Sequence, residues 1–531
     1  MSCSELWNLV KENPSELASW ERLVVACEQD GDSSKTQEAY SAFLSEFPLL
    51  HVYWKKYAEF QSSISTTAAL TIYQTAVKAC PFVPELWMDY TSFMQTSNSE
   101  PSSIREVYVQ ALSTVGLFAT SSDLWMKWAE YEQSIEGSFD QPSVEEEPTP
   151  FFSDVLFLQA SALCRSLGIL LVALTVPTRK LQDIYEYAVE IIEKLNVSEL
   201  FKPPVLAEPL SSALAFPSSF QSKLTPLTSP SQHSSRDSFL SSLEEFYSST
   251  LAEFNELTQF ESELRRTWFS PKPLPPRQLS VWRDYLVAVQ SMEKDKEYVL
   301  SLFNRCVVTC ANYLEFWVMF GSYCVRVNQS KVIVDRIRPA SDVFLKYSPR
   351  FKLFALTLLE MATDFDADDV SKEYSDLLKS FPDDVCTALQ YAGFLLRIQQ
   401  KSSSFDLFRT YLAKVSSDQA LKVAFLLSQI RILFKNLPPT EAIAEVVTIL
   451  LNHIKPEFKV LFIETFSFVK NDDDVCANFL QFLEDIITPR LESDEGSFLI
   501  DLVSILTEEQ SLVNPKRGIE LNNLKCKVTR F

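Results

Sequence analysis

Three segments of the chain share one pattern: HVYWKKYAEFQ at residues 51–61, PELWMDYTSFM at 84–94 and SDLWMKWAEYEQ at 122–133. Each segment places a tryptophan three positions before a second aromatic residue, in the pairs Trp54/Tyr57, Trp87/Tyr90 and Trp125/Trp128. LASWERLVVACEQ, around Trp20, is a weaker copy. Successive tryptophans are 34, 33 and 38 residues apart. This period is typical of one helical hairpin per repeat.

A second kind of segment lies between the tryptophan segments: TQEAYSAFLSEFP, ALTIYQTAVKACP and SIREVYVQALSTVG. Each has an aromatic residue near its middle and small residues beyond it, and Ile72, Ala76 and Ala79 would share one helix face. Pro48 and Pro81 follow two of these segments, where a proline ends a helix. A single hairpin has too little core to fold alone, so stacked hairpins must bury a continuous core. The sequence predicts an all-α solenoid.

The same pattern returns later in the chain, in the pairs Trp282/Tyr285 and Trp317/Phe320, which are 35 residues apart. Between them, LFNRCVVTC at 302–310 places Cys306 and Cys310 on one helix face, at positions where other repeats carry alanine. A zinc site would need two more cysteine or histidine ligands at close spacing, and the sequence offers none nearby. We therefore interpret these cysteines as small hydrophobic core residues.

Composition divides the chain into two blocks. The first block spans 1–200 and contains an acidic loop at about 134–153; the second spans 239–531, with aromatic positions that degenerate towards a leucine-rich helical tail and a basic end expected to fray. Between the blocks, 201–238 is rich in proline and serine and predicts a flexible linker. The linker contains Thr228-Ser229-Pro230, and the sequence does not decide whether it is phosphorylated.

One apolar stretch, 157–177, is the best candidate for a membrane span, but Arg165 interrupts it, so we expect a buried helix instead. The chain opens without the basic and then apolar pattern of a signal peptide, so we expect reduced thiols.

Several function classes are disfavoured by composition. The chain has 8 scattered glycines, which rules out the glycine-rich phosphate loops of nucleotide-binding enzymes. Its 3 histidines are remote from one another, and no catalytic, cofactor-binding or metal-binding residue is predicted. The formal net charge of −22 would repel a phosphate backbone, so little direct RNA binding is expected beyond a local basic patch.

The tryptophan–aromatic pattern, with its trailing proline, resembles the half-a-tetratricopeptide (HAT) repeat. The central section is more specific and resembles the pre-mRNA-processing factor 39 family. The resemblance rests on the following positions: Phe260-Glu261, Arg265-Arg266, Trp268-Phe269, Lys272-Pro273-Leu274, Trp282, Tyr285, Leu286, Arg305-Cys306, Cys310-Ala311 and Phe316-Trp317.

This resemblance implies a nuclear, non-catalytic scaffold in pre-mRNA splicing that helps commit the U1 small nuclear ribonucleoprotein (snRNP) to the 5′ splice site. It also implies U1 snRNP proteins as partners, and a homodimer, or a heterodimer with a paralogous HAT protein, through the second block. The residues singled out are structural repeat positions: Trp20, Trp54, Tyr57, Trp87, Tyr90, Trp125, Trp128, Trp282, Tyr285, Trp317 and Phe320.

The sequence leaves other functions open. Another HAT scaffold, for messenger RNA 3′-end cleavage or ribosomal RNA processing, would share the repeat but not the central block. The α subunit of a protein prenyltransferase also stacks tryptophan-bearing hairpins, but its repeats would end in arginine where this chain has tyrosine, tryptophan or phenylalanine. A co-chaperone with a basic clamp is disfavoured by the acidic charge.

Overall fold

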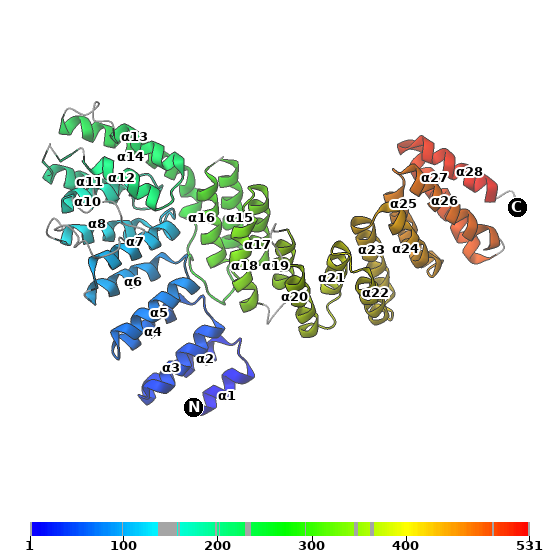
Figure 1. Ribbon diagram of the computed structural model, residues 1–531, viewed down its shortest axis with the longest axis horizontal. Helices are drawn as coiled ribbons and strands as arrows, with labels where there is room; N and C mark the ends of the chain where they lie inside the picture. Colours follow the sequence, from blue (N-terminus) through cyan, green and yellow to red (C-terminus); the bar gives the residue numbers. More distant parts are fainter. Residues whose placement is uncertain are drawn as a thin grey trace. The chain divides into compact units, whose positions relative to one another are not determined.

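The computed structural model describes residues 3–97, 99–135, 157, 160–196, 199–200, 202–228, 235–292, 294–344, 349–361, 366–490 and 493–528. Throughout these residues the regular structure is helical, which confirms the predicted all-α fold (Figure 1). The chain divides into two compact units, Met1–Val343 and Phe344–Phe531.

The helices of the first unit follow the chain as α1 (Cys3–Glu12), α2 (Leu17–Asp30), α3 (Ser33–Glu46), α4 (His51–Ser62), α5 (Thr66–Ala79), α6 (Pro84–Thr96), α7 (Pro101–Val115), α8 (Ser122–Ser134), α10 (Ala162–Ala173), α11 (Leu181–Lys194), α12 (Lys202–Ala213), α13 (Ser218–Thr228), α14 (Arg236–Glu261), α15 (Pro276–Ser291), α16 (Lys296–Thr309), α17 (Leu314–Arg326) and α18 (Ser330–Phe344).

The second unit holds α19 (Pro349–Glu360), α20 (Ala367–Ser380), α21 (Val385–Arg397), α22 (Lys401–Val415), α23 (Gln419–Asn436), α24 (Pro439–Leu451), α25 (Lys459–Val469), α26 (Asp473–Ile487), α27 (Asp494–Val513) and α28 (Pro515–Val528), with the 3₁₀ turns Pro456–Phe458 and Thr488–Arg490. A continuous core runs through α21 to α28 and is made mostly of leucine, isoleucine, valine and phenylalanine.

Helix ends are set by local signals in the sequence. Gly31 ends α2 with a φ of +74°, a conformation that glycine adopts at little cost. The Asp32 side chain then caps α3 by accepting hydrogen bonds from the backbone N–H groups of Ser34 and Lys35. Pro84 and Pro276 open α6 and α15 at the first turn, where the missing N–H has no partner to lose. Short connections of this kind bring consecutive helices together as antiparallel hairpins, visible as a stepped row from α2 to α8 in Figure 1.

The structure differs from the predicted flexible linker at 201–238. Residues 202–228 form α12 and α13, and α12 packs against α10. The apolar residues Leu206, Leu210 and Leu214 recur every four positions and are buried, although proline and serine around them hide this period. The boundary between the compact units falls instead after Val343. The Ser229-Pro230 part of the phosphorylation motif and most of the acidic loop, residues 136–153, lie outside the described residues.

The apolar stretch at 157–177 contributes α10, whose residues from Cys164 to Ala173 are all buried. Across the described ranges, the structure offers no helix with both the length and the apolar character that a membrane crossing requires. The C-terminal segment also differs from the expected frayed end, because α28 packs on α27 and buries Leu521 and Leu524.

Candidate functional site

Five of the repeat tryptophans tie their helix to the connection that precedes it. The indole Nε1 of Trp20 donates a hydrogen bond to the carbonyl oxygen of Pro14, six residues earlier, at 2.8 Å. The same bond recurs at Trp54, Trp87 and Trp317, to Pro48, Pro81 and Ala311, at 2.8, 2.8 and 3.0 Å. Trp125 instead donates to the Gly116 carbonyl at 3.2 Å. Each of these tryptophans therefore satisfies a carbonyl that the preceding helix end leaves without a helical partner.

Aromatic pairs join the second helix of one hairpin to the first helix of the next. In six such pairs the ring centroids lie 5.0–5.7 Å apart and the ring planes differ by 4–11°: Tyr40/Tyr57, Tyr73/Tyr90, Tyr108/Trp128, Phe260/Tyr285, Phe303/Phe320 and Tyr374/Tyr391. Stacked aromatics of this kind add stability beyond the area they bury. The last pair lies in the second unit, where the sequence carries no tryptophan to mark the repeat.

All eleven residues singled out from the sequence are buried, with at most 9% of each exposed: Trp20, Trp54, Tyr57, Trp87, Tyr90, Trp125, Trp128, Trp282, Tyr285, Trp317 and Phe320. They lie in the first unit, on α2, α4, α6, α8, α15 and α17. In these positions their rings face neighbouring helices and offer no free surface to a partner.

Glu261, at the end of α14, gathers cationic groups from distant parts of the first unit. Arg305 on α16 contacts both carboxylate oxygens, at 2.5 and 2.9 Å, and Arg179, just before α11, donates to Oε2 at 2.8 and 3.0 Å. The Tyr285 hydroxyl donates to Oε1 at 2.9 Å. Burial alone would raise the pKa of Glu261, but the two guanidinium groups hold this pKa at about 2. Glu261 therefore links α14, through ion pairs, to α16 and to the segment before α11, which are far apart in the sequence.

A second carboxylate, Glu132 on α8, is held in a similar way. Arg105 on α7 donates two hydrogen bonds to it, at 2.6 and 2.8 Å, and Arg165 on α10 donates a third at 2.7 Å. All three side chains are buried. Arg165, which argued against a membrane span in the sequence, thus has a buried partner. Neither of the two ionic clusters was predicted, because their members lie 27 to 82 residues apart.

The cysteines of α16 lie in the core. Cys306 and Cys310 are fully buried and carry free thiols. Burial raises the pKa of Cys306 well above its usual range, which is the opposite of what a reactive thiol needs. The described residues contain no group of histidine, cysteine, aspartate or glutamate side chains that could hold a metal ion.

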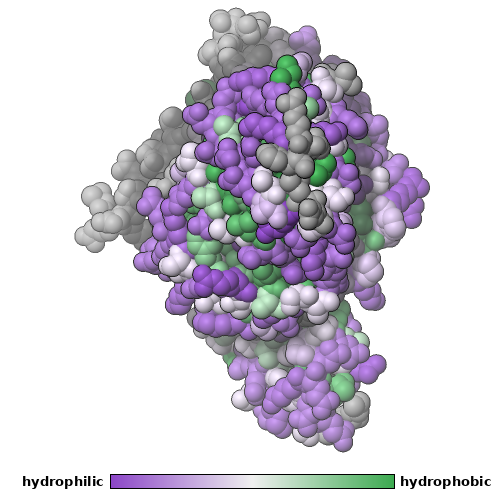
Figure 2. Space-filling model, turned by 90° about the vertical axis from the view of Figure 1, so that its right-hand side faces the viewer, coloured by the Kyte–Doolittle hydropathy of each residue, from purple (hydrophilic) through white to green (hydrophobic). Residues whose placement is uncertain are grey.

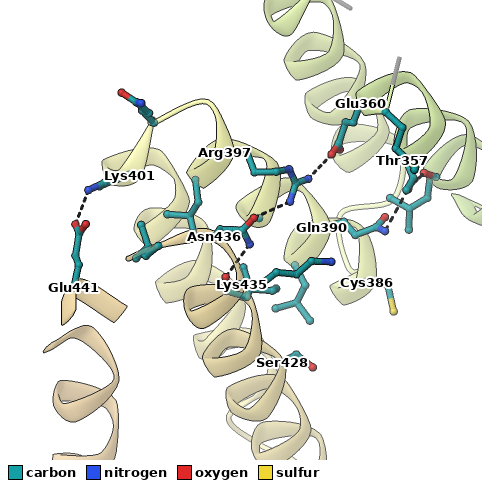
Figure 3. A pocket seen from close by; sticks show the side chains of 18 of the residues that line it. Thr357, Glu360, Cys386, Gln390, Arg397, Lys401, Ser428, Lys435, Asn436 and Glu441 are labelled. Carbon is teal, nitrogen blue, oxygen red and sulfur yellow. Dashed lines mark hydrogen bonds and ion pairs between the residues drawn. The ribbon is translucent and has the colours of Figure 1, made fainter. Parts of the chain in front are cut away.

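A groove of about 1360 Å³ opens on the second unit, lined by α19, α21 and α23 and by the starts of α22 and α24 (Figure 3). Arg397 reaches across it to Glu360 and to Asn436, with Nη1 of Arg397 3.1 Å from Oδ1 of Asn436. Lys401 pairs with Glu441 at the rim, at 2.5 Å. Leucine, isoleucine and methionine side chains supply most of the apolar part of the lining, and no histidine is among the lining residues. This mixture of apolar, amide and charged groups suits recognition of a protein segment.

On the face shown in Figure 2, hydrophilic residues predominate and hydrophobic residues gather mainly near the middle. Some large apolar side chains are exposed in the described residues, including Trp268 in the first unit and Val513 and Ile519 in the second. Such residues, and not the buried repeat aromatics, are the positions available to partners.

Comparison with known families matches both repeat regions. Residues 4–141 match the PRP39 N-terminal HAT repeat, and residues 255–397 match the PRP39 C-terminal HAT repeat. The chain belongs to the PRP39 family. The two matched ranges cover more than half of the 531 residues, and they include all eleven repeat positions named above.

Relatives of known name agree with this family. The chain is 26% identical to "Pre-mRNA-processing factor 39" of Schizosaccharomyces pombe over 360 residues, covering 64% of this chain and 54% of that protein. It is 24% identical to the human protein of the same name over 341 residues, covering 60% of this chain and 47% of that protein. The chain thus spans about half the length of the curated relatives it matches. A shorter similarity, 22% over 135 residues, covers 24% of this chain and 18% of "mRNA 3′-end-processing protein rna14" of Schizosaccharomyces pombe.

Proposed function

We propose that this PRP39-family chain is a non-catalytic scaffold in pre-mRNA splicing. It would act in the nucleus with the U1 snRNP and help commit U1 to the 5′ splice site through protein contacts. The observation that carries the proposal is the match of both repeat regions to PRP39 HAT repeats, together with relatives named for pre-mRNA processing.

The physical character of the chain supports a scaffold role. The repeat aromatics and the two ionic clusters are used internally, and the groove on the second unit offers apolar and amide surface for a protein segment. The net charge of −22 favours basic protein partners over a phosphate backbone as the main contacts.

The proposal is tested by purifying the tagged chain from nuclear extract and measuring the bound small nuclear RNAs. We expect U1 RNA and U1 proteins to be enriched over U2 RNA. Loss of U1 enrichment together with recovery of 3′-end cleavage factors would instead favour the 3′-end processing role, which the rna14 similarity supports over a short range. Recovery of neither set would contradict a splicing scaffold.

We further propose that the chain dimerises through its second block, either with itself or with a paralogous HAT protein. Val513, the last residue of α27, and Ile519 on α28 are exposed aliphatic residues of the last hairpin. Light scattering should give twice the chain mass of 60.6 kDa for a homodimer, and Val513→Asp should shift it towards the single-chain mass. The matched control is Val25→Asp, at an exposed valine on α2. A single-chain mass for the wild type would exclude the homodimer, and an unchanged dimer in Val513→Asp would exclude this surface.

A further inference from the structure

The connection between α14 and α15, SELRRTWFSPKPLP at residues 262–275, combines an exposed tryptophan with exposed cations. Trp268 is 46% exposed, and Arg265 and Lys272 are also exposed. We propose that this loop, called here the Trp268 loop, is a contact site for single-stranded RNA. The proposal stands on the loop itself and does not depend on the U1 assignment above.

The Trp268 loop is ordered by its own hydrogen bonds although it forms no helix. The Arg266 guanidinium donates to the carbonyl of Lys272 at 3.0 Å, which closes the loop across its tip. The backbone N–H of Leu274 donates to the Tyr313 hydroxyl at 2.7 Å, and that of Arg265 donates to the Gln278 side chain at 3.0 Å. The loop therefore holds its exposed groups in place before any partner arrives, which lowers the entropy cost of binding.

The Trp268 loop is anchored to the core by other side chains, and Trp268 itself is exposed. Leu264, Phe269 and Leu274 of the same loop are each buried, with 4–5% exposed. These three side chains already supply the apolar contacts that fix the loop, so the exposed indole of Trp268 is not needed for that purpose. A large aromatic ring held at the surface costs solvation, and it offers a flat face on which a nucleic acid base can stack.

Local charge around Trp268 has the opposite sign to the chain as a whole. Arg265 and Lys272 flank the indole in the sequence, and no acidic side chain is paired with either in the described structure. Arg277 follows at the start of α15 and makes an exposed ion pair with Glu263 at 3.1 Å, a pair that exchanges easily with a phosphate. Since the chain carries −22 overall, a phosphate backbone would be attracted only to a local cluster such as this one.

The prolines of the loop raise the alternative of a proline-rich ligand for another protein's aromatic groove. Such ligands present an extended strip of side chains to the partner, but Leu274 in the middle of PKPLPP is buried and its N–H is bonded to Tyr313. An acidic peptide would match the cations but would leave the indole face unused. A single strand uses both, because bases stack on aromatic rings while phosphates contact arginine and lysine.

The test measures fluorescence anisotropy of a labelled 12-nucleotide oligouridine titrated with the full chain at low salt. We expect a dissociation constant on the order of 10⁻⁵ M, as for non-specific nucleic acid binding. Trp268→Ala should weaken binding about tenfold, and Trp268→Phe should restore most of the loss, because stacking needs only an aromatic face. The double variant Arg265→Gln/Lys272→Gln should reduce the slope of log affinity against log salt by about 1.4, since each phosphate contact contributes about 0.7 for a single strand.

The matched charge control is Lys379→Gln/Arg409→Gln, which removes two exposed cations from the second unit. This control variant should change the affinity for oligouridine and the salt slope much less than the loop variants do, because it removes the same charge away from the loop. Thermal melts should show that all variants stay folded. Equal losses in the control and the loop variants would overturn the proposal, as would the absence of binding up to about 10⁻⁴ M. If a decaglutamate peptide bound at the loop and oligouridine did not, the site would belong to an acidic protein and the RNA assignment would be wrong.

Discussion

Glu132 and Glu261 are each held by two arginines, yet they sit in different structural settings. Glu132 on α8 takes its arginines from α7 and α10, and both arginines are buried. Glu261 takes Arg305 from α16 and Arg179 from the connection before α11, 44 and 82 residues away, and the Arg179 side chain is 36% exposed.

The same arrangement, one glutamate bound by two arginines, therefore has two different structural roles. The Glu132 cluster joins α8 to helices packed against it, and its three charged side chains are at most 3% exposed. The Glu261 cluster joins segments that do not follow each other in the stack, with one cation left partly in solvent. A buried ion pair adds little over apolar packing, but removing one member is costly because the other charge stays buried. The cost of such a change should therefore scale with how completely water is excluded.

The largest effect is expected for Glu132→Gln. This change leaves Arg105 and Arg165 buried without a counter-charge and should lower the free energy of unfolding by about 3–5 kcal/mol. Urea unfolding followed by circular dichroism measures it. The control is Glu190→Gln on α11, which removes an exposed pair with Lys194 and should cost less than about 0.5 kcal/mol. A cost for Glu132→Gln as small as that of the control would show that water reaches the cluster.

The pH dependence of stability isolates the contribution of the Glu261 charge to the free energy of unfolding. The pKa of Glu261 is about 2 in the folded chain, against an ordinary glutamate value of 4.5. The charge of Glu261 therefore stabilises the fold above pH 4.5, and that stabilisation is lost as pH falls from 4.5 towards 2. The full contribution is about 3 kcal/mol, since one pKa unit corresponds to about 1.4 kcal/mol. The stability gap between the wild type and Glu261→Gln, measured by urea unfolding from pH 7 to pH 3, should therefore narrow below pH 4.5. A gap independent of pH over that range would contradict the ion pairs at Glu261.

The smallest effect is expected for Arg179→Ala. Glu261 keeps Arg305 and Tyr285 as partners, and water can replace the partly exposed Arg179, so the cost should be only about 1–2 kcal/mol. Arg165→Ala at the enclosed cluster provides the comparison and should cost about 3–5 kcal/mol. Thermal unfolding of both variants measures the two losses of stability, which can then be compared. Equal costs would mean that exposure of the cation does not distinguish the two clusters.

The hairpin architecture could be predicted from the sequence because its signal is local and repeated. Trp54 and Trp87 mark helices at a fixed period, and prolines six residues before them mark the connections that accept their hydrogen bonds. Helices α12 and α13 were missed because proline and serine dominate 201–238, while the period of Leu206, Leu210 and Leu214 is carried by few residues. In this segment the spacing of the leucines indicates the helices better than the proline and serine content does.

The ionic clusters could not be predicted, because nothing in the sequence pairs residues so far apart. Glu261 and Arg305 both stood in the block that resembles the PRP39 family, but their contact depends on how α14 and α16 pack. Trp268 was part of the same block, and the sequence alone did not distinguish this exposed tryptophan from the buried ones. Both features depend on tertiary packing, which a repeat period does not specify.

The recurring bond from an indole to the carbonyl six residues earlier has a consequence for how this chain tolerates insertions and deletions. At Trp20, Trp54, Trp87 and Trp317 the bond fixes the number of residues between two hairpins, so one added residue would separate donor from acceptor. In the described residues, the connections inside the hairpins α2–α3, α4–α5 and α6–α7 carry no such indole bond. Length variation should therefore collect along one edge of the stack, where new segments can be added without changing the spacing of the repeats.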